Sequence, residues 1–99
     1  MNSLFYERCY ALLKRVPKGK VTTYKEIAKA LETRAYRAVG NAMNRNQSKE
    51  VPCHRVIKSN GEIGGFAHGT AEKIRLLKKE GIEIIDNKID LEKYRYNFS

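Results

Sequence analysis

Apolar residues near the start of the chain recur at the spacing of an amphipathic helix. Phe5, Cys9, Leu12 and Val16 lie three or four positions apart, with charged residues among them. This spacing places the four side chains on one face of a helix. The segment at 17–20, Pro-Lys-Gly-Lys, contains two residues that disfavour helix and predicts where that helix ends.

Two more helical patterns follow, separated by a break at 32–33. In the first, Thr23 and Glu26 have the T-x-x-E spacing of a capping box, which predicts a helix start. Its apolar face consists of Tyr24, Ile27, Ala28 and Leu31. The second pattern, within 34–44, has an apolar face of Tyr36, Val39, Gly40 and Met43. Two short helices joined by a tight break are typical of a helix-turn-helix motif.

The second half of the chain combines short strands with one more helix. Val56–Ile57 and Glu62–Ile63 flank a Ser-Asn-Gly turn at 59–61, which predicts a small hairpin. A further helix is expected to begin at a Thr70 cap and to end at Gly81. These elements predict a mainly helical α+β fold, a winged-helix-like domain with the helix-turn-helix at its centre and the hairpin beside Cys53.

Length and composition favour one compact domain. The 99 residues, of which 41% are hydrophobic, suffice for a modest core, so we expect a single domain over 1–99 with 82–99 as a C-terminal tail. No apolar run approaches the roughly 20 residues that cross a bilayer, and no membrane partner is expected. Two cysteines are too few for a disulfide framework. The cytoplasm is therefore the expected location.

Positive charge is concentrated in one half of the chain. Of the 20 Lys and Arg and 11 Asp and Glu residues, 12 basic and 4 acidic ones lie in 1–55, a net charge of +8 out of a total of +9. A basic half of this kind indicates a nucleic-acid partner, because neutralising phosphates drives such binding. A lysine-rich soluble surface accounts for the same numbers, and charge alone does not separate the two.

Candidate chemistry lies at Cys53, His54 and Arg55, which follow Pro52 directly. A thiol near its ordinary pKa is mostly protonated at neutral pH, so a nucleophilic cysteine needs a base, a cation or a helix N-terminus nearby. Without such help a single cysteine is more often a small buried hydrophobic residue. The two cysteines and two histidines lack the spacing of zinc ligands, so neither a metal nor another cofactor is expected.

The segment VPCHRVI at 51–57 resembles the active-site signature of the 6-O-methylguanine-DNA alkyltransferases. Four other segments occur in the order and at the spacing of that family: GKVTTYKEIA at 19–28, RAYRAVGNAMNRN at 34–46, NGEIGGF at 60–66 and EKIRLLKKEG at 72–81. The resemblance covers about residues 4–81. It implies repair of DNA by stoichiometric transfer of the alkyl group of 6-O-methylguanine to a cysteine of the protein.

The resemblance also implies a role for each reactive residue. Cys53 would accept the alkyl group, and His54 would take the thiol proton through a water. Glu80 would orient the imidazole, as the acid does in a catalytic triad. Tyr24 would stabilise or protonate the departing guanine. The enzyme would act once per chain, as a monomer and without a cofactor.

Double-stranded DNA containing alkylated guanine is the partner that the resemblance implies, bound through its minor groove. Arg37 would enter the duplex and fill the space left by the rotated nucleotide, because the target atom cannot be reached inside the base stack. The other residues expected to contact DNA are Thr23, Arg34, Ala38, Asn41 and Arg45.

Several residues would shape or support the pocket for the base. Asn46 resembles the residue that ties the reactive turn to the helix-turn-helix, and Arg55 would anchor the same turn. The backbone of Val56 and the loop at Phe66 and Ala67 would line the pocket. Phe66 stands where many members have tyrosine, and His68 stands where glycine is common.

Simpler explanations exist for the same residues taken singly. Tyr24 can be a core aromatic, Arg37 a solvated helix charge and Asn46 a loop residue with turn hydrogen bonds. Glu80 can be an ordinary residue in the last turn of a helix, although an acid there opposes the helix dipole. Only their joint occurrence favours a site.

Two other functions remain open at this point. Alkyltransferase-like lesion binders share the short architecture, flip damaged bases and carry tryptophan at the cysteine position. Cys53 favours true transfer. A small helix-turn-helix regulator is the third hypothesis, although such regulators usually dimerise and no dimerisation stripe is evident. The chain is also expected to lack the N-terminal domain of longer members of the family.

Overall fold

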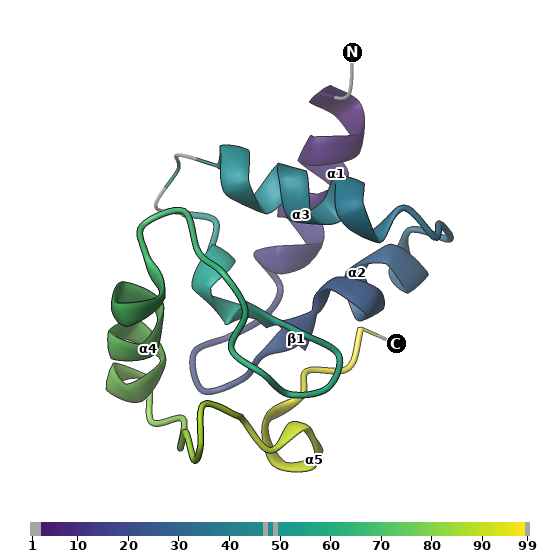
Figure 1. Cartoon of the computed structure of the whole chain (residues 1–99). Helices are drawn as coiled ribbons and strands as arrows, with labels where there is room; N and C mark the ends of the chain where they lie inside the picture. Colours follow the sequence, from purple (N-terminus) through teal and green to yellow (C-terminus); the bar gives the residue numbers. More distant parts are fainter. Residues whose placement is uncertain (1–2, 47, 49, 99) are drawn as a thin grey trace.

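The computed structural model describes residues 3–46, 48 and 50–98 (Figure 1). The helices are α1 (Ser3–Leu13), α2 (Tyr24–Ala30), α3 (Tyr36–Arg45), α4 (Thr70–Lys79) and the short α5 (Leu91–Tyr94). A 3-10 turn at Cys53–Arg55 precedes β2 (Val56–Ile57), which pairs with β1 (Thr22–Thr23). The mainly helical α+β fold expected from the sequence is confirmed. Within the described residues, no helix has the length and apolarity that crossing a membrane requires.

The helix-turn-helix is built from α2 and α3, as predicted. The Thr23 side chain caps α2, because its Oγ1 atom accepts a hydrogen bond of 3.0 Å from the backbone N–H of Glu26. The chain then turns sharply at Glu32, whose φ is +57°. The Thr33 N–H bonds back to the Ala28 carbonyl at 3.0 Å and closes the end of α2.

One part of the predicted apolar face of α3 is wrong. Its buried residues are Val39, Ala42 and Met43, whereas Tyr36 is 46% exposed. Tyr36 is the first residue of the helix, and the preceding Ala35 has backbone angles of φ −80° and ψ 63°. These angles, with a 2.8 Å bond from the Tyr36 N–H to the Arg34 carbonyl, describe an inverse γ-turn at the helix entrance.

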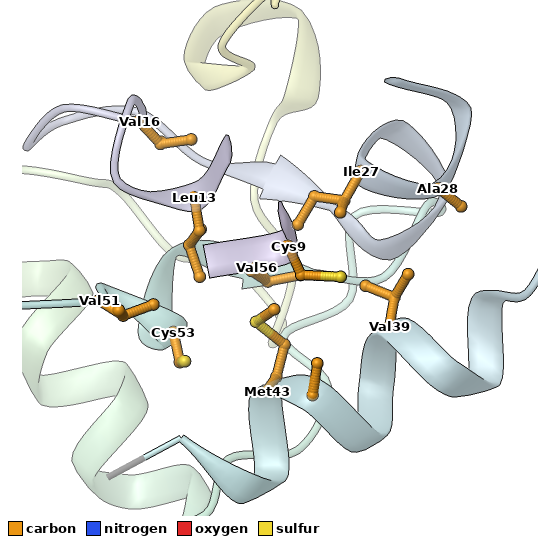
Figure 2. Packing of buried hydrophobic residues seen from close by; sticks show 11 residues of the cluster. Cys9, Leu13, Val16, Ile27, Ala28, Val39, Met43, Val51, Cys53 and Val56 are labelled. Carbon is orange, nitrogen blue, oxygen red and sulfur yellow. The ribbon is translucent and has the colours of Figure 1, made fainter. Parts of the chain in front are cut away.

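The first hydrophobic cluster holds α1, α2 and α3 together (Figure 2). Cys9 and Leu13 of α1 meet Ile27 of α2 and Val39 of α3, and all four are fully buried. The Tyr10 hydroxyl adds a 2.6 Å bond to the Ala42 carbonyl on α3. The helix-turn-helix is thus fixed against α1, which positions the face of α3 that remains exposed.

The predicted hairpin is not the pairing that the structure shows. The chain does turn back after β2, with bonds of 2.9 Å from the Gly61 N–H to the Lys58 carbonyl and 3.0 Å from the Lys58 N–H to the Glu62 carbonyl. However, β2 pairs in parallel with β1. Both residues of β2 are fully buried, so this strand needs cover on both faces, which a two-stranded surface hairpin does not supply.

The end of α4 matches the prediction and its start does not. Gly81 has φ +89°, and its N–H bonds to the Lys78 carbonyl at 3.0 Å while the Ile82 N–H bonds to the Leu77 carbonyl at 3.1 Å. This is a Schellman motif, which favours glycine because of the positive φ. Thr70 is the first helical residue rather than the cap, and Gly69 holds the N-cap position.

Residues 82–98 complete a second hydrophobic cluster. Ile82, Ile89 and Tyr94 pack with Val21 of the strand region, among other buried residues. The Val21 N–H bonds to the Tyr94 carbonyl at 2.9 Å, and the Tyr96 N–H bonds to the Val21 carbonyl at 2.8 Å. The segment predicted as a tail is therefore part of the packed domain.

Candidate functional site

Cys53 lies at the entrance of the short 3-10 turn that follows Pro52. Its side chain is 8% exposed and sits at the margin of the first cluster, beside Val51 (Figure 2). The Cys53 N–H bonds to the Val51 carbonyl at 2.8 Å, and the Arg55 N–H bonds to the Pro52 carbonyl at 2.9 Å. These bonds define a tight turn from Val51 to Arg55.

Asn46 connects the end of α3 to the reactive turn. It is the C-cap residue of α3, and its Nδ2 atom lies 3.0 Å from the Cys53 Sγ and 3.2 Å from the Val51 carbonyl. The same Nδ2 lies 3.1 Å from the Ser48 carbonyl, and the Asn46 Oδ1 accepts the Ser48 N–H at 3.1 Å. One amide therefore holds both the thiol and the loop in front of it.

Glu80 binds two side chains of the reactive turn at once. His54 Nε2 lies 2.8 Å from the Glu80 Oε2. Arg55 donates to both carboxylate oxygens, from Nε at 3.0 Å and from a terminal nitrogen at 2.8 Å. A third Arg55 nitrogen bonds to the Val16 carbonyl at 2.8 Å. A bidentate pair of this kind fixes the carboxylate in position, so the imidazole is oriented from behind.

The directions of the pKa shifts of His54 and Glu80 are consistent with an uncharged His54 imidazole at about pH 7. Burial lowers the pKa of His54, and the hydrogen bond and charge of Glu80 only partly oppose this. For Glu80 burial acts to raise the pKa, but the hydrogen bonds from Arg55 and His54 outweigh it and the net pKa is lowered. The pair is therefore an ionised carboxylate and an imidazole that can still accept a proton.

The surroundings of the Cys53 thiol favour its protonated form. Burial raises its pKa, against the lowering effects of the Asn46 hydrogen bond and the charge of Lys73. A nucleophilic role for Cys53 would therefore require a base nearby, as expected from the sequence.

Lys73 is a site residue that sequence reasoning missed. It is fully buried on α4, and its ammonium donates to the Val56 carbonyl at 2.6 Å and to the Gly65 carbonyl at 2.9 Å. Burial lowers its pKa to about 8, with the charge of Cys53 acting in the opposite direction. A signal existed, because Lys73 stands four residues before Leu77 and so lies on the inward stripe of the helix.

A cavity of about 650 Å³ opens beside the thiol. Its lining residues come from the end of α3, the reactive turn, the glycine-rich loop and α4. They are Met43, Asn46, Ser48, Val51, Pro52, Cys53, His54, Phe66, Ala67, His68, Glu72 and Leu76. The Phe66 ring meets the His68 ring edge-on with centroids 5.3 Å apart. The volume falls in the range of small-molecule pockets.

Of the residues predicted to line or support the pocket, Asn46, Phe66 and Ala67 line this cavity, and Arg55 and Val56 do not. Val56 does not line the cavity, but its carbonyl holds the Lys73 ammonium. Tyr24 is also absent from the lining; it is half-buried and packs against the first cluster. Burial and then the nearby Cys53 raise the pKa of Tyr24, so its hydroxyl stays protonated.

The predicted DNA-contact residues divide by exposure. Arg34, Arg37, Asn41 and Arg45 are exposed, and Ala38 is half-buried between them. Among the described residues, none of the three arginines forms an ion pair. Thr23 is 3% exposed and its hydroxyl is used to cap α2; its expected contact with DNA stays a prediction.

Donors for a metal are scattered in the part of the chain that the structure describes. No group of three or more His, Cys, Asp and Glu side chains there is placed to hold an ion. Cys9 lies in the first cluster, and burial raises its pKa to about 11. The site near Cys53 is therefore built from a thiol, an imidazole, a carboxylate, an amide and two cations.

Comparison with known proteins gives consistent matches. The family model for the DNA-binding domain of 6-O-methylguanine DNA methyltransferase matches residues 4–82. A bifunctional methyltransferase/endonuclease of Picrophilus torridus is 47% identical over 94 residues, which are 93% of this chain and 32% of that protein. The chain spans between about a third and about half of the length of the first curated relatives it matches.

Two solved structures show the same fold at different coverage. S. pombe Atl1, in complex with damaged DNA containing O6-carboxymethylguanine, matches with a TM-score of 0.85 and 34% identity over 95% of each chain. The O6-methylguanine-DNA methyltransferase of Pyrococcus kodakaraensis KOD1 matches with a TM-score of 0.72 and 48% identity, over 79% of this chain and 46% of that one.

Proposed function

The chain belongs to the 6-O-methylguanine DNA methyltransferase family, and we propose that it repairs DNA by moving an alkyl group from the exocyclic oxygen of guanine to Cys53. The observation that carries the proposal is the pair of contacts in the reactive turn, with the Asn46 Nδ2 at 3.0 Å from the Cys53 Sγ and the His54 Nε2 at 2.8 Å from the Glu80 carboxylate. The reaction occurs once per chain, because a thioether offers no leaving group that water displaces under mild conditions.

Activation of the thiol falls to His54. Its Nε2 is bonded to Glu80, so Nδ1 is left to accept the thiol proton through one water. The lowered pKa keeps the imidazole neutral and able to act as a base at neutral pH. Glu80 then stabilises the imidazolium that forms, as the acid does in a catalytic triad. The buried pair with Arg55 prevents the carboxylate from moving away.

Transfer follows by in-line displacement at the alkyl carbon. The Sγ electron pair of Cys53 forms the new sulfur–carbon bond, the carbon–oxygen bond breaks, and its electron pair stays on the guanine. Tyr24 would stabilise or protonate the departing base, and its raised pKa keeps the hydroxyl protonated and able to donate a hydrogen bond. The charge of Lys73 and the amide of Asn46 lower the energy of the thiolate before the attack.

DNA binding is the second part of the proposal. The exposed arginines of α3 would bind phosphates and enter the minor groove of a duplex that contains alkylated guanine, with Arg37 in the base stack. The cavity beside Cys53 would receive the extruded base between Phe66 and the reactive turn. The protein would work as a monomer in the compartment that holds the DNA, which we take to be the cytoplasm.

Lesion binding without transfer is the second candidate. It is favoured by the match to S. pombe Atl1, which was solved on damaged DNA and has nearly the same extent as this chain. Cys53, with a base behind it and a cation beside it, favours transfer. A transcription regulator is less well supported, because nothing in the described fold supplies a paired reader for a second half-site.

Intact-mass spectrometry separates these functions. The chain is incubated with a duplex that contains 6-O-methylguanine, and we expect a mass gain of one methyl group that maps to Cys53. Cys53→Ser removes the gain, whereas the control Cys9→Ser keeps it. Binding without any mass gain at stoichiometric DNA would contradict transfer and support the lesion binder. Multiple turnovers, or label on Cys9, would also overturn the proposal.

A further inference from the structure

Tyr36 is a large aromatic residue that the fold leaves at the surface. Only three large hydrophobic side chains of the described residues are exposed, namely Leu4, Tyr36 and Ile85. Tyr36 is the aromatic one, and it opens α3 directly beside Arg37. Helical spacing places it on the stripe of Val39 and Met43, yet it contributes nothing to the buried core. Its exposure therefore needs a physical reason.

The backbone at the helix entrance explains why the ring does not pack inward. Ala35 forms the inverse γ-turn described above, and no side chain caps the N-terminus of α3. The nearby buried position is occupied by Val39, which is fully buried against α1 and α2. The turn thus leaves Tyr36 at the start of α3, outside the buried core and next in sequence to the exposed Arg37.

Two exposed arginines flank Tyr36 in the sequence. In the described part of the chain neither Arg34 nor Arg37 forms an ion pair. An exposed aromatic residue next to such arginines is the composition of a nucleic-acid surface, where cations bind phosphates and rings stack on bases or sugars. A protein interface also uses tyrosine and arginine, and the test below includes that outcome.

We propose that Tyr36 is a second DNA-contact residue of this site, whose ring packs against the nucleotide next to the step that Arg37 enters. Successive residues of a helix are about 100° apart around its axis and about 1.5 Å apart along it, so the two side chains reach neighbouring nucleotides rather than the same one. The proposal rests on the proposed function, because it requires that α3 face a duplex. It assigns Tyr36 to affinity and to duplex recognition, not to the chemistry at Cys53.

A neutral ring and a charged side chain leave different signatures in the salt dependence of binding. Each phosphate that a cation neutralises adds about one unit to the slope of log affinity against log salt concentration. A stacked ring adds affinity without adding to that slope. Tyr36→Ala should therefore weaken binding of a duplex about tenfold, the effect of losing one base–aromatic contact, with an unchanged slope. Tyr36→Phe should retain the affinity.

The matched control is Ile85→Ala, which removes another exposed hydrophobic side chain that lies outside the helix-turn-helix. Its affinity for the duplex should equal that of the unchanged chain. Transfer from a free-base substrate should be the same for all three variants, because no duplex is involved. A loss on the free base as large as the loss on the duplex would show that Tyr36 supports the fold of the site, and would overturn the proposal.

A fluorescent reporter tests the contact directly. The chain contains no tryptophan, so Tyr36→Trp introduces a single indole at this position, and Ile85→Trp introduces one at the control position. We expect emission from Tyr36→Trp to be quenched on binding a labelled duplex, and emission from Ile85→Trp to be unchanged. Binding of the duplex, seen by anisotropy of its label, without quenching would overturn the role of Tyr36.

The same experiment separates failure of this inference from failure of the proposed function. If the unchanged chain does not bind the labelled duplex, DNA recognition itself is contradicted. If the unchanged chain binds the duplex and self-associates in its absence, and Tyr36→Ala abolishes only the self-association, the ring serves contact between copies of this chain and the proposal for Tyr36 is wrong.

Discussion

The charged side chains of the reactive turn and those on the exposed face of α3 differ in burial and in pairing. In the reactive turn the charged side chains are nearly buried and bonded, as in the pairing of Glu80 with His54 and Arg55 at 11–12% exposure. On α3, Arg37 and Arg45 are exposed and form no ion pair in the described structure. Chemistry requires groups that are fixed before the substrate arrives. Recognition of DNA requires cations whose partners arrive with the phosphates.

The same contrast separates two kinds of energetic consequence. A buried pair that loses one partner leaves an uncompensated charge, so changes in the reactive turn should affect both stability and rate. An exposed arginine contributes little to folding, so changes on α3 should affect binding and leave stability intact. Substitutions in the reactive turn should therefore change stability and rate together, and substitutions on α3 should change DNA binding alone.

The largest effect is expected for Glu80→Gln. The substitution keeps the shape but removes the charge that faces His54 and Arg55. The single-turnover rate on a free-base substrate should fall more than about tenfold at neutral pH, a barrier change of roughly 1.4 kcal/mol or more. The free energy of unfolding should fall by about 2 kcal/mol, because Arg55 keeps its charge without a partner. Rapid-quench kinetics measure the single-turnover rate, and urea unfolding measures the free energy of unfolding.

A control for Glu80→Gln is Glu62→Gln, which breaks an exposed pair with Lys58 at 3.3 Å. It should leave rate and stability as they were, since exposed pairs are screened by solvent. If Glu80→Gln behaves like this control, then Glu80 only ends α4 near Gly81, and His54 activates the thiol without it.

The second prediction is on the other region. Arg37→Ala should lower the transfer rate from a duplex about tenfold or more, because extrusion of the nucleotide costs a few kcal/mol that the inserted side chain offsets. The rate on the free base should not change, and neither should the unfolding midpoint. Equal losses of rate on the duplex and on the free base would contradict an inserted Arg37. They would also show that α3 affects the chemistry as well as DNA binding.

The sequence predicted well those features that neighbouring residues determine. The capping box of Thr23 and Glu26 and the glycine that ends α4 depend on bonds within a few residues. Helical spacing likewise located Val39 and Met43 in the core. The roles of Cys53, His54 and Glu80 came from the family resemblance, and they remain predictions that the geometry supports.

Features that depend on distant partners were missed. Nothing local in Val56–Ile57 indicates that Thr22–Thr23 is its neighbour, so a turn signal was read as a hairpin. Lys73 was not singled out from the sequence, because the two carbonyls that hold its ammonium in the interior belong to other segments of the chain. Tyr36 was read by its periodicity as core, although the γ-turn before it directs it outward.

The third prediction concerns the pH dependence of transfer, where Lys73 is a buried cation next to the reactive region. The lowered pKa of His54 places the acid limb of the rate profile below the range where a free imidazole titrates, because the base is lost only when the imidazole protonates. The Lys73 pKa of about 8 places a fall above that pH, because loss of its charge destabilises the thiolate. A bell-shaped profile on a free-base substrate is expected.

Lys73→Met assigns the alkaline limb of that profile. The substitution keeps a long apolar stem and removes the charge, so the rate at pH 7 should fall several-fold, roughly 1 kcal/mol of barrier, and the limb near pH 8 should disappear. If the limb persists in this variant, another group titrates there. The near-ultraviolet circular dichroism of the aromatic residues, which include Phe66 on the loop that Lys73 holds, should be unchanged and serves as the structural check.

The smallest effect is expected for Arg34→Ala, and it is the most direct test of the exposed region. Arg34 precedes the γ-turn, is exposed and, in the described chain, has no ion-pair partner, so its only proposed role is to neutralise a phosphate. The slope of log affinity against log salt should become shallower by about one unit, with a few-fold loss of affinity at low salt and almost none at high salt. Anisotropy titrations of undamaged duplex at several salt concentrations measure this, since phosphate binding does not require a lesion.

An unchanged slope would mean that Arg34 lies outside the interface, and would move the DNA-contact surface toward Arg37, Asn41 and Arg45. A loss of affinity that is the same at every salt concentration would instead assign Arg34 to base or sugar contacts. Arg34 and the ring of Tyr36 would then contribute to binding in the same, salt-independent way.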